Sequence, residues 1–151
     1  FEGSARVPRI ISAPSSEFEK GKVAKSPTEL VDLYPTLSEL CGLEIPDHVM
    51  GKRLLRALAD PDSNLMKSAY SVTEYRTVSS EDGSKFLGRK IRTDINSYTE
   101  WDEGDFGVEL YDYENDPEEL TNLARDPESA NLVKSLRREL RNRMAEAAAN
   151  W

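Results

Sequence analysis

The feature that most constrains the fold is an alternation of apolar and polar side chains in the stretch GRKIRTDINSYTEW, which runs from Gly88 to Trp101. A period of two is the pattern of a strand with one buried face, and it predicts a strand over Phe86–Asp94. The dipeptide Asn96-Ser97 is typical of a turn, and Tyr98–Trp101 continues as a second extended segment. The stretch therefore predicts a β-hairpin.

Two further strands and a long helix are predicted around this hairpin. Ala69–Tyr75 and Val108–Tyr113 are rich in strand formers, and polar loops over 77–83, 102–107 and 115–122 separate the strands. Asp126 caps the final helix, with Pro127 at its first position. The expected buried stripe of this helix is Leu132, Leu136, Leu140 and Met144. Residues 67–151 are thus expected to form an α+β subdomain, with about four antiparallel strands covered by the C-terminal helix.

The first part of the chain, residues 1–66, is expected to contain one strand and two helices. Arg6–Ser12 predicts a short strand, which Pro8 would hold at a sheet edge or a strand start because proline cannot donate to the ladder. Lys52–Ala59 predicts a short helix that ends at Asp60-Pro61. This part has no sheet of its own, so its apolar surfaces need something else to pack on.

The longer helix of this part is predicted within Ser26–Gly42. The residues that favour its start are an N-cap, a first-turn proline and a capping-box glutamate, namely Ser26, Pro27 and Glu29. Gly42 suits the position after its end. Pro35 lies inside the pattern, so the helix either kinks there or begins near Asp32. Its apolar face is made of Leu30, Leu33, Leu37, Leu40 and Cys41.

Composition excludes several classes of function. The net charge is −8, with 28 acidic and 20 basic residues, which argues against nucleic-acid binding because phosphate contacts need clustered cations. The basic cluster Lys134–Arg143 is interleaved with acids and is expected to be a solvated helix face. No segment approaches the roughly 18 apolar residues of a membrane span. The single Cys41 cannot form an internal disulfide and is expected to be a small buried side chain.

No catalytic centre can be recognised from the residues alone. His48 is the only histidine, so no zinc spacing exists, and a structural or surface role is favoured for it. The acidic runs Glu100–Asp105 and Asp112–Glu119 do not match a calcium-loop pattern and are expected to be solvated turns. Phosphate-binding loops, dinucleotide fingerprints and nucleophile elbows are absent from the sequence.

Five segments, taken in order, resemble the C-terminal part of type I sulfatases, most closely iduronate-2-sulfatases and their bacterial relatives. They are RVPRIISAP, ELVDLYPTLSELCGLEIP, GKRLLRALADP, GRKIRTDINSYTEW and VELYDYENDPEELTNLA. The resemblance implies an α/β, alkaline-phosphatase-like sulfatase, of which this chain is mainly the C-terminal α+β subdomain. Residues 1–66 would then be the end of the α/β domain, and residues 67–151 the subdomain.

The implied chemistry is hydrolysis of sulfate esters by a sulfuric ester hydrolase, with sulfated sugars as the expected substrates. In the parent enzyme it would depend on calcium and on a formylglycine made from cysteine, and this chain would bind neither. Cys41 is followed by Gly-Leu-Glu, which is not the modification motif, so no catalytic or metal-binding residue is assigned here. The chain alone is expected to be inactive. An exported, periplasmic or lysosomal location is implied by the resemblance.

Two residues are candidates for contact with the substrate. The smaller subdomain of such enzymes lends basic residues to the pocket rim, where they meet a sugar carboxylate, and the matching positions are Arg76 and Lys85. The expected partners are the N-terminal catalytic part, which would be missing here, and a sulfated carbohydrate, with no nucleic acid and no membrane. Because the chain does not begin with methionine, it is expected to be a processed light chain or a truncated piece.

Two other readings remain open. The chain could be a non-catalytic protein-interaction domain that uses its acidic surface or the apolar face of its first half. It could also belong to a phosphatase or phosphoglycerate-mutase relative of the same superfold, although the ending VELYDYENDPEELTNLA favours the sulfatase. A free-standing module would be monomeric and would unfold cooperatively. A piece of a larger enzyme would expose an apolar patch that binds hydrophobic dyes.

Overall fold

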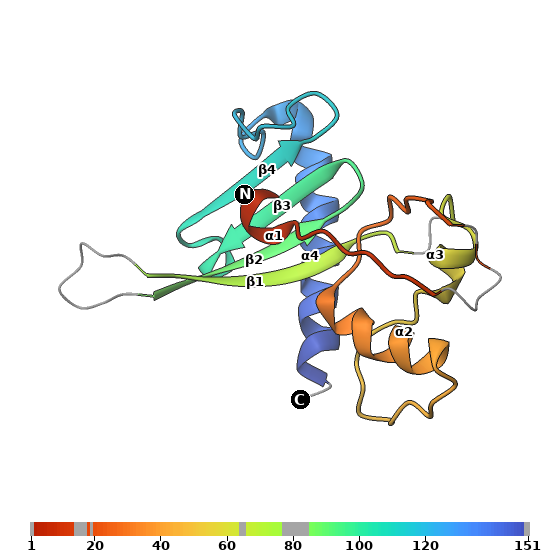
Figure 1. Ribbon diagram of the computed structural model, residues 1–151. Helices are drawn as coiled ribbons and strands as arrows, with labels where there is room; N and C mark the ends of the chain where they lie inside the picture. Colours follow the sequence, from red (N-terminus) through yellow and green to blue (C-terminus); the bar gives the residue numbers. More distant parts are fainter. Residues whose placement is uncertain (1, 14–17, 19, 64–65, 77–84, 150–151) are drawn as a thin grey trace. The chain divides into compact units, whose positions relative to one another are not determined.

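The computed structural model describes residues 2–13, 18, 20–63, 66–76 and 85–149. It divides the chain into two compact units, with the boundary between Ala69 and Tyr70. The first unit is built from short helices and loops, and the second from a sheet and one long helix (Figure 1).

The second unit contains the sheet that the alternating segments predict. Its strands are β1 (Ala69–Arg76), β2 (Lys85–Arg92), β3 (Asn96–Trp101) and β4 (Gly107–Asp112), in the order β1-β2-β3-β4. β3 pairs antiparallel with β2 and with β4. After the short turns η2 (Asp102–Gly104) and η3 (Pro127–Ser129), helix α4 (Ala130–Ala149) lies along one face of the sheet (Figure 1). The predicted four-stranded sheet with a long C-terminal helix is confirmed.

The core of this unit lies between α4 and the sheet. Its buried members are Ile91, Tyr98, Leu110, Leu136 and Leu140. Met144 packs against this core as expected, but the prediction that Leu132 is buried is wrong, and Val133 takes its place. At about 100° per residue, Val133 lies about 40° around the helix from the midpoint of Leu136 and Leu140, whereas Leu132 lies about 60° from it, so Val133 faces the core more directly.

The hairpin exists, but its turn lies two residues earlier than expected. Asp94-Ile95 forms the loop, and Asn96-Ser97 already belongs to β3. Thr93 closes the loop, because its N–H donates to the Asn96 carbonyl oxygen at 2.9 Å and its hydroxyl accepts from the Asn96 N–H at 2.9 Å. This register places Ile91 opposite Tyr98 on the core face. A slip by one residue would turn both side chains to the other face.

The first unit contains α1 (Glu2–Ala5), the 3-10 turn η1 (Leu30–Asp32), α2 (Leu33–Leu40) and α3 (Leu55–Ala59). The strand predicted over Arg6–Ser12 is wrong, since this segment is irregular and Ile10 is 91% exposed. A strand needs a neighbour to accept from its backbone N–H groups, and the described residues of this unit include no strand that could serve. The short helix before Asp60-Pro61 is confirmed as α3.

The longer helix begins later than the proline and serine signals suggest. Ser26 does not cap it, because its hydroxyl donates to the carbonyl oxygen of Ser63 at 3.0 Å. The start is fixed instead by Asp32, whose carboxylate accepts from the Glu29 N–H at 2.7 Å. The predicted end is confirmed, since Gly42 has a left-handed φ of +65°.

Cys41 is exposed, so the expectation of a buried cysteine is wrong. It is the C-cap residue of α2 and lies beyond the buried face of that helix. Within the described part of the chain, no helix is both long enough and apolar enough to cross a membrane.

Candidate substrate-contact site

The two candidate contact residues lie at one end of neighbouring strands. Arg76 is the last residue of β1 and Lys85 is the first residue of β2, and the segment 77–84 that joins them lies outside the described residues. The side chain of Arg76 is also outside the described part. Lys85 Nζ lies 3.6 Å from Glu74 Oε2, and both side chains are largely exposed. An exposed pair of this kind contributes little to stability.

A buried polar cluster of the second unit is centred on Glu100, a residue that was expected in a solvated turn. The side chain of Glu100 is 1% exposed, and it lies beside Tyr98 on the face of β3 that α4 covers. Its Oε1 accepts from the Tyr98 hydroxyl at 2.7 Å and from Arg137 Nε at 2.8 Å. Its Oε2 accepts from Arg141 Nη2 at 2.7 Å.

This cluster also corrects the expectation that Lys134–Arg143 is a purely solvated face. Arg137 and Arg141 lie four residues apart on α4, so both reach the same carboxylate. The signal in the sequence was the period of two, which places Glu100 on the same face of β3 as Tyr98. The matching signal in the last helix was the four-residue spacing of Arg137 and Arg141, which places both arginines on one face of that helix.

The pKa shifts in this cluster favour a structural role over a catalytic one. Burial, together with the hydrogen bond to Glu100, raises the pKa of Tyr98 to about 12. The hydrogen bonds to Tyr98 and Glu100 raise the pKa of Arg137. Both groups therefore stay protonated at neutral pH and cannot serve as a base there. The cluster holds α4 on β3.

A second buried ion pair lies on the opposite face of the sheet. Lys90 follows the same alternation as Ile91 but points the other way, and its Nζ lies 3.6 Å from Glu119 Oε1. The Tyr113 hydroxyl donates to the same oxygen at 2.5 Å, and the Arg92 guanidinium stacks 3.9 Å above the Tyr113 ring. Glu119 is 7% exposed, so the expectation of a solvated turn is wrong here also.

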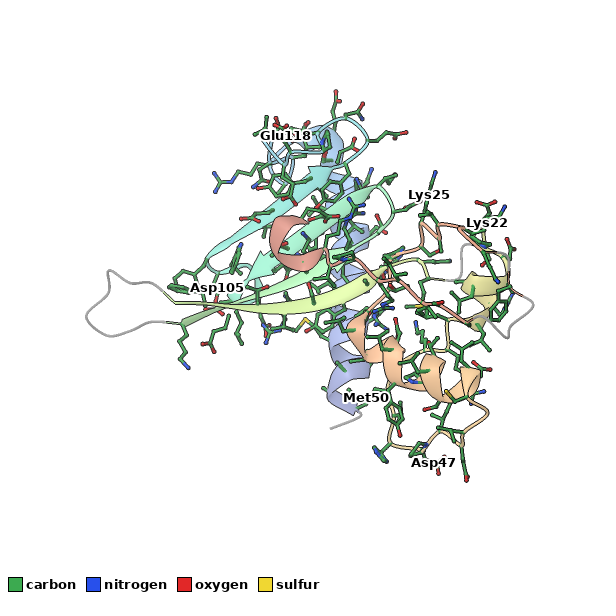
Figure 2. All side chains as sticks on the ribbon, in the orientation of Figure 1. Lys22, Lys25, Asp47, Met50, Asp105 and Glu118 are labelled. Carbon is green, nitrogen blue, oxygen red and sulfur yellow. The ribbon has the colours of Figure 1, made fainter. Side chains whose placement is uncertain are left out.

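Two further acidic residues, Asp102 and Glu103, accept hydrogen bonds from β2 and α4. Asp102 Oδ1 accepts from the Leu87 N–H at 2.8 Å, and Arg141 donates to both the carboxylate and the carbonyl oxygen of Glu103. These contacts fix two consecutive left-handed residues in the turn where Figure 2 labels Asp105. Among the described residues, no three of the side chains His, Cys, Asp and Glu converge as a metal site would require. His48 is exposed in the loop after α2.

The comparisons with known proteins cover almost the whole chain. Residues 1–146 match the family model described as N-sulphoglucosamine sulphohydrolase, C-terminal. The chain is 30% identical over 134 residues to arylsulfatase K of Xenopus laevis, with 82% of this chain and 23% of that protein covered. It is 31% identical to the Delta 4,5-hexuronate-2-O-sulfatase of Bacteroides thetaiotaomicron, with 88% of this chain and 27% of that protein covered.

The fold agrees with that of a solved 2-O GAG sulfatase. The TM-score is 0.61 at 32% identity, with 78% of this chain and 24% of that chain covered. The chain thus spans about a quarter of the length of the relatives that it matches.

Proposed function

We propose, because the chain belongs to the sulfatases through their N-sulphoglucosamine sulphohydrolase C-terminal family, that it is the C-terminal part of an enzyme that hydrolyses sulfate esters of sugars. The match over residues 1–146 is the observation that carries this proposal. Residues 1–66 are assigned to the end of the α/β domain of that enzyme, and residues 67–151 to its smaller subdomain.

Two of the relatives favour a sulfated uronic acid as the substrate. One is named a Delta 4,5-hexuronate-2-O-sulfatase, and a solved relative is a 2-O GAG sulfatase. Both names specify a 2-O sulfate, and the first specifies a sugar that carries a carboxylate. We therefore propose that the parent enzyme removes a 2-O sulfate from a hexuronate. This agrees with the resemblance to iduronate-2-sulfatases.

Calcium and formylglycine would supply the chemistry of the parent enzyme, and the described residues of this chain do not fit either group. Cys41 lacks the modification motif, since Gly42, Leu43 and Glu44 follow it. The described carboxylates form no cluster suited to a metal, and several of them are already bound by arginine, lysine or backbone N–H groups. Both groups are therefore assigned to the part of the enzyme outside this chain.

The chain itself would contribute cations to the rim of the pocket. Arg76 and Lys85 border the same segment, 77–84, so a carboxylate bound at this end of β1 and β2 could contact both. Arginine binds a carboxylate through two parallel hydrogen bonds, whereas lysine supplies a point charge. Lys85 would leave its weak contact with Glu74 to do so.

The test compares this chain with the extended protein, defined as the same chain preceded by its upstream part. Both are given a 2-O-sulfated hexuronate disaccharide and 4-nitrophenyl sulfate, and released sulfate is measured. We expect activity only in the extended protein and a preference for the uronate. Turnover by the chain alone, or none by the extended protein on either substrate, would refute the proposal.

The contact residues are tested in the extended protein with Arg76→Ala and Lys85→Ala. Loss of one charge-assisted hydrogen bond is expected to raise KM for the uronate about tenfold or more, with kcat nearly unchanged. The effect should vanish on 4-nitrophenyl sulfate, which has no carboxylate. Lys134→Ala is the matched control, because Lys134 is an exposed cation on α4. Equal effects on the two substrates would show that these residues do not read the carboxylate.

A further inference from the structure

Helix α2 and the preceding turn η1 are amphipathic in the inverted sense. The side that is buried in the first unit is mostly polar, and it includes Asp32, Thr36 and Ser38. The opposite side is apolar and exposed, with exposed fractions of 64% for Leu30, 47% for Val31, 56% for Tyr34 and 47% for Leu37. A surface helix normally shows the reverse arrangement. Four large apolar side chains on one short segment mark an interaction surface.

Hydrogen bonds fix the polar side in place. The Asp32 carboxylate accepts from the Lys52 N–H at 2.8 Å and from the Glu29 N–H at 2.7 Å. The Thr36 hydroxyl donates to the Asp32 carbonyl oxygen at 2.6 Å and accepts from the Leu54 N–H at 3.1 Å. Rotating the helix to bury Leu37 would break these bonds and leave buried backbone N–H groups without partners.

A close approach between the backbones of Gly51 and Val31 also holds η1 in this orientation. A Cβ on Gly51 would lie 2.0 Å from the Val31 carbonyl oxygen, so only glycine lets the loop approach η1 this closely. Met50, labelled in Figure 2, directly precedes this glycine, so its backbone is held next to η1, and its side chain is 42% exposed. The irregular segment that carries exposed Ile10 is tied to the same place, because Arg9 donates to the Glu29 carbonyl oxygen.

We infer that this surface, made of Leu30, Val31, Tyr34, Leu37 and Met50, is the face by which the chain docks onto the upstream catalytic part of its own enzyme. The inference rests on the proposed function, because that function supplies the occupant. The relatives are matched over only 23% and 27% of their length, and the family match is to a C-terminal domain, so most of such an enzyme lies upstream. An apolar face on a preorganised helix suits a permanent intramolecular contact of this kind.

The experiment uses the double variant Leu30→Lys/Leu37→Lys in this chain and in the extended protein. In the chain alone both leucines are exposed, so we expect an unchanged melting temperature and a loss of hydrophobic-dye binding. In the extended protein both would be buried. We therefore expect proteolysis under native conditions to become about tenfold faster or more, because the docked state is disfavoured.

Leu120→Lys is the matched control, since Leu120 is 79% exposed in the turn after β4 and lies outside this surface. It should change neither protein. Equal proteolysis of the double variant and the unsubstituted extended protein would overturn the inference. A lower melting temperature of the substituted chain alone would also overturn it, because that result would mean that the two leucines are already buried within this chain.

Two further results separate the occupants and the two proposals. If the chain alone forms a dimer that the double variant abolishes, and the extended protein is unaffected, the occupant is a second copy and the inference fails. If the unsubstituted extended protein lacks sulfatase activity on both substrates but shows the proteolysis contrast, the docking surface stands and the proposed function fails.

Discussion

Replacing Glu100 by glutamine tests whether the buried carboxylate holds α4 on the sheet. The carboxylate accepts three hydrogen bonds of 2.7 to 2.8 Å, two of them from arginines. Glutamine has nearly the same shape but no charge. Its amide NH₂ group would face at least one of the donors that the carboxylate now accepts from, and a donor cannot accept that hydrogen bond. Hydrogen bonds to charged groups contribute about 1.5–3 kcal/mol each.

The lower end of that range applies here, because Arg137 and Arg141 keep side-chain exposures of 50% and 37% and can return to water. Two such bonds give an expected loss of about 3 kcal/mol in the free energy of unfolding of the second unit. Native-state amide exchange of the β3 residues measures this quantity without interference from the first unit.

The control is Glu103→Gln. Glu103 also contacts Arg141, at 3.1 Å, but its side chain is 61% exposed, so the expected loss is at most about 0.5 kcal/mol. If Glu100→Gln and Glu103→Gln destabilise β3 equally, the buried carboxylate does not hold the unit together, and the reasoning is refuted.

Three further predictions concern the backbone and pH. Gly51→Ala should destabilise the first unit by about 2 kcal/mol or more, because the new Cβ would overlap the Val31 carbonyl oxygen; amide exchange in α2 and α3 would detect it. The raised pKa of Tyr98 means that its stabilisation is complete below pH 10 and is lost as the pH rises toward 12, by about 3 kcal/mol, which Tyr98→Phe should remove from the alkaline unfolding curve. Hydrogen bonds from the Asn115 side chain and from backbone lower the pKa of Asp112, so its stabilisation is present above the ordinary pKa of 3.8 and disappears as the pH falls through the lowered value. An NMR titration of the side-chain carboxyl groups measures this pKa, with Asp112→Asn used to assign the signal. An ordinary pKa for Asp112 would contradict the prediction.

Features set by short-range patterns could be predicted from the sequence. The alternation along β2 and β3, the Asp126 cap of the last helix and the glycine after α2 depend on neighbours within a few residues. These signals gave the sheet, the long helix and the end of α2 correctly. They act on the local backbone, so no knowledge of distant contacts was needed.

Features set by distant partners could not be predicted in this way. Glu100 was assigned to a solvated turn because four of the six residues in its run are acidic, and its burial is stabilised only because Arg137 and Arg141 reach it from another element. The turn of the hairpin was misplaced because Thr93, and not the dipeptide Asn96-Ser97, closes it. The candidate residues Arg76 and Lys85 came from the resemblance, and they remain a prediction.

The helices of the two units bury opposite kinds of side chain, apolar in α4 and polar in α2. This difference bears on what kind of protein the chain belongs to. In the second unit, Leu136 and Leu140 of α4 are buried against the sheet, and buried carboxylates are paired with cations. In the first unit, Leu37 faces water while Thr36 is fully buried. A fold in which this face stays uncovered would gain stability by turning the leucine inward, yet the side chains of Asp32 and Thr36 accept hydrogen bonds from backbone N–H groups of the loop and hold the helix in the inverted orientation. Burial of apolar surface is the main favourable term in folding, so a fold that gives it up and fixes the result with buried hydrogen bonds is one whose apolar face is satisfied elsewhere. The exposed face therefore requires a covering surface, and the family match over residues 1–146 makes the rest of a larger enzyme the source of that surface.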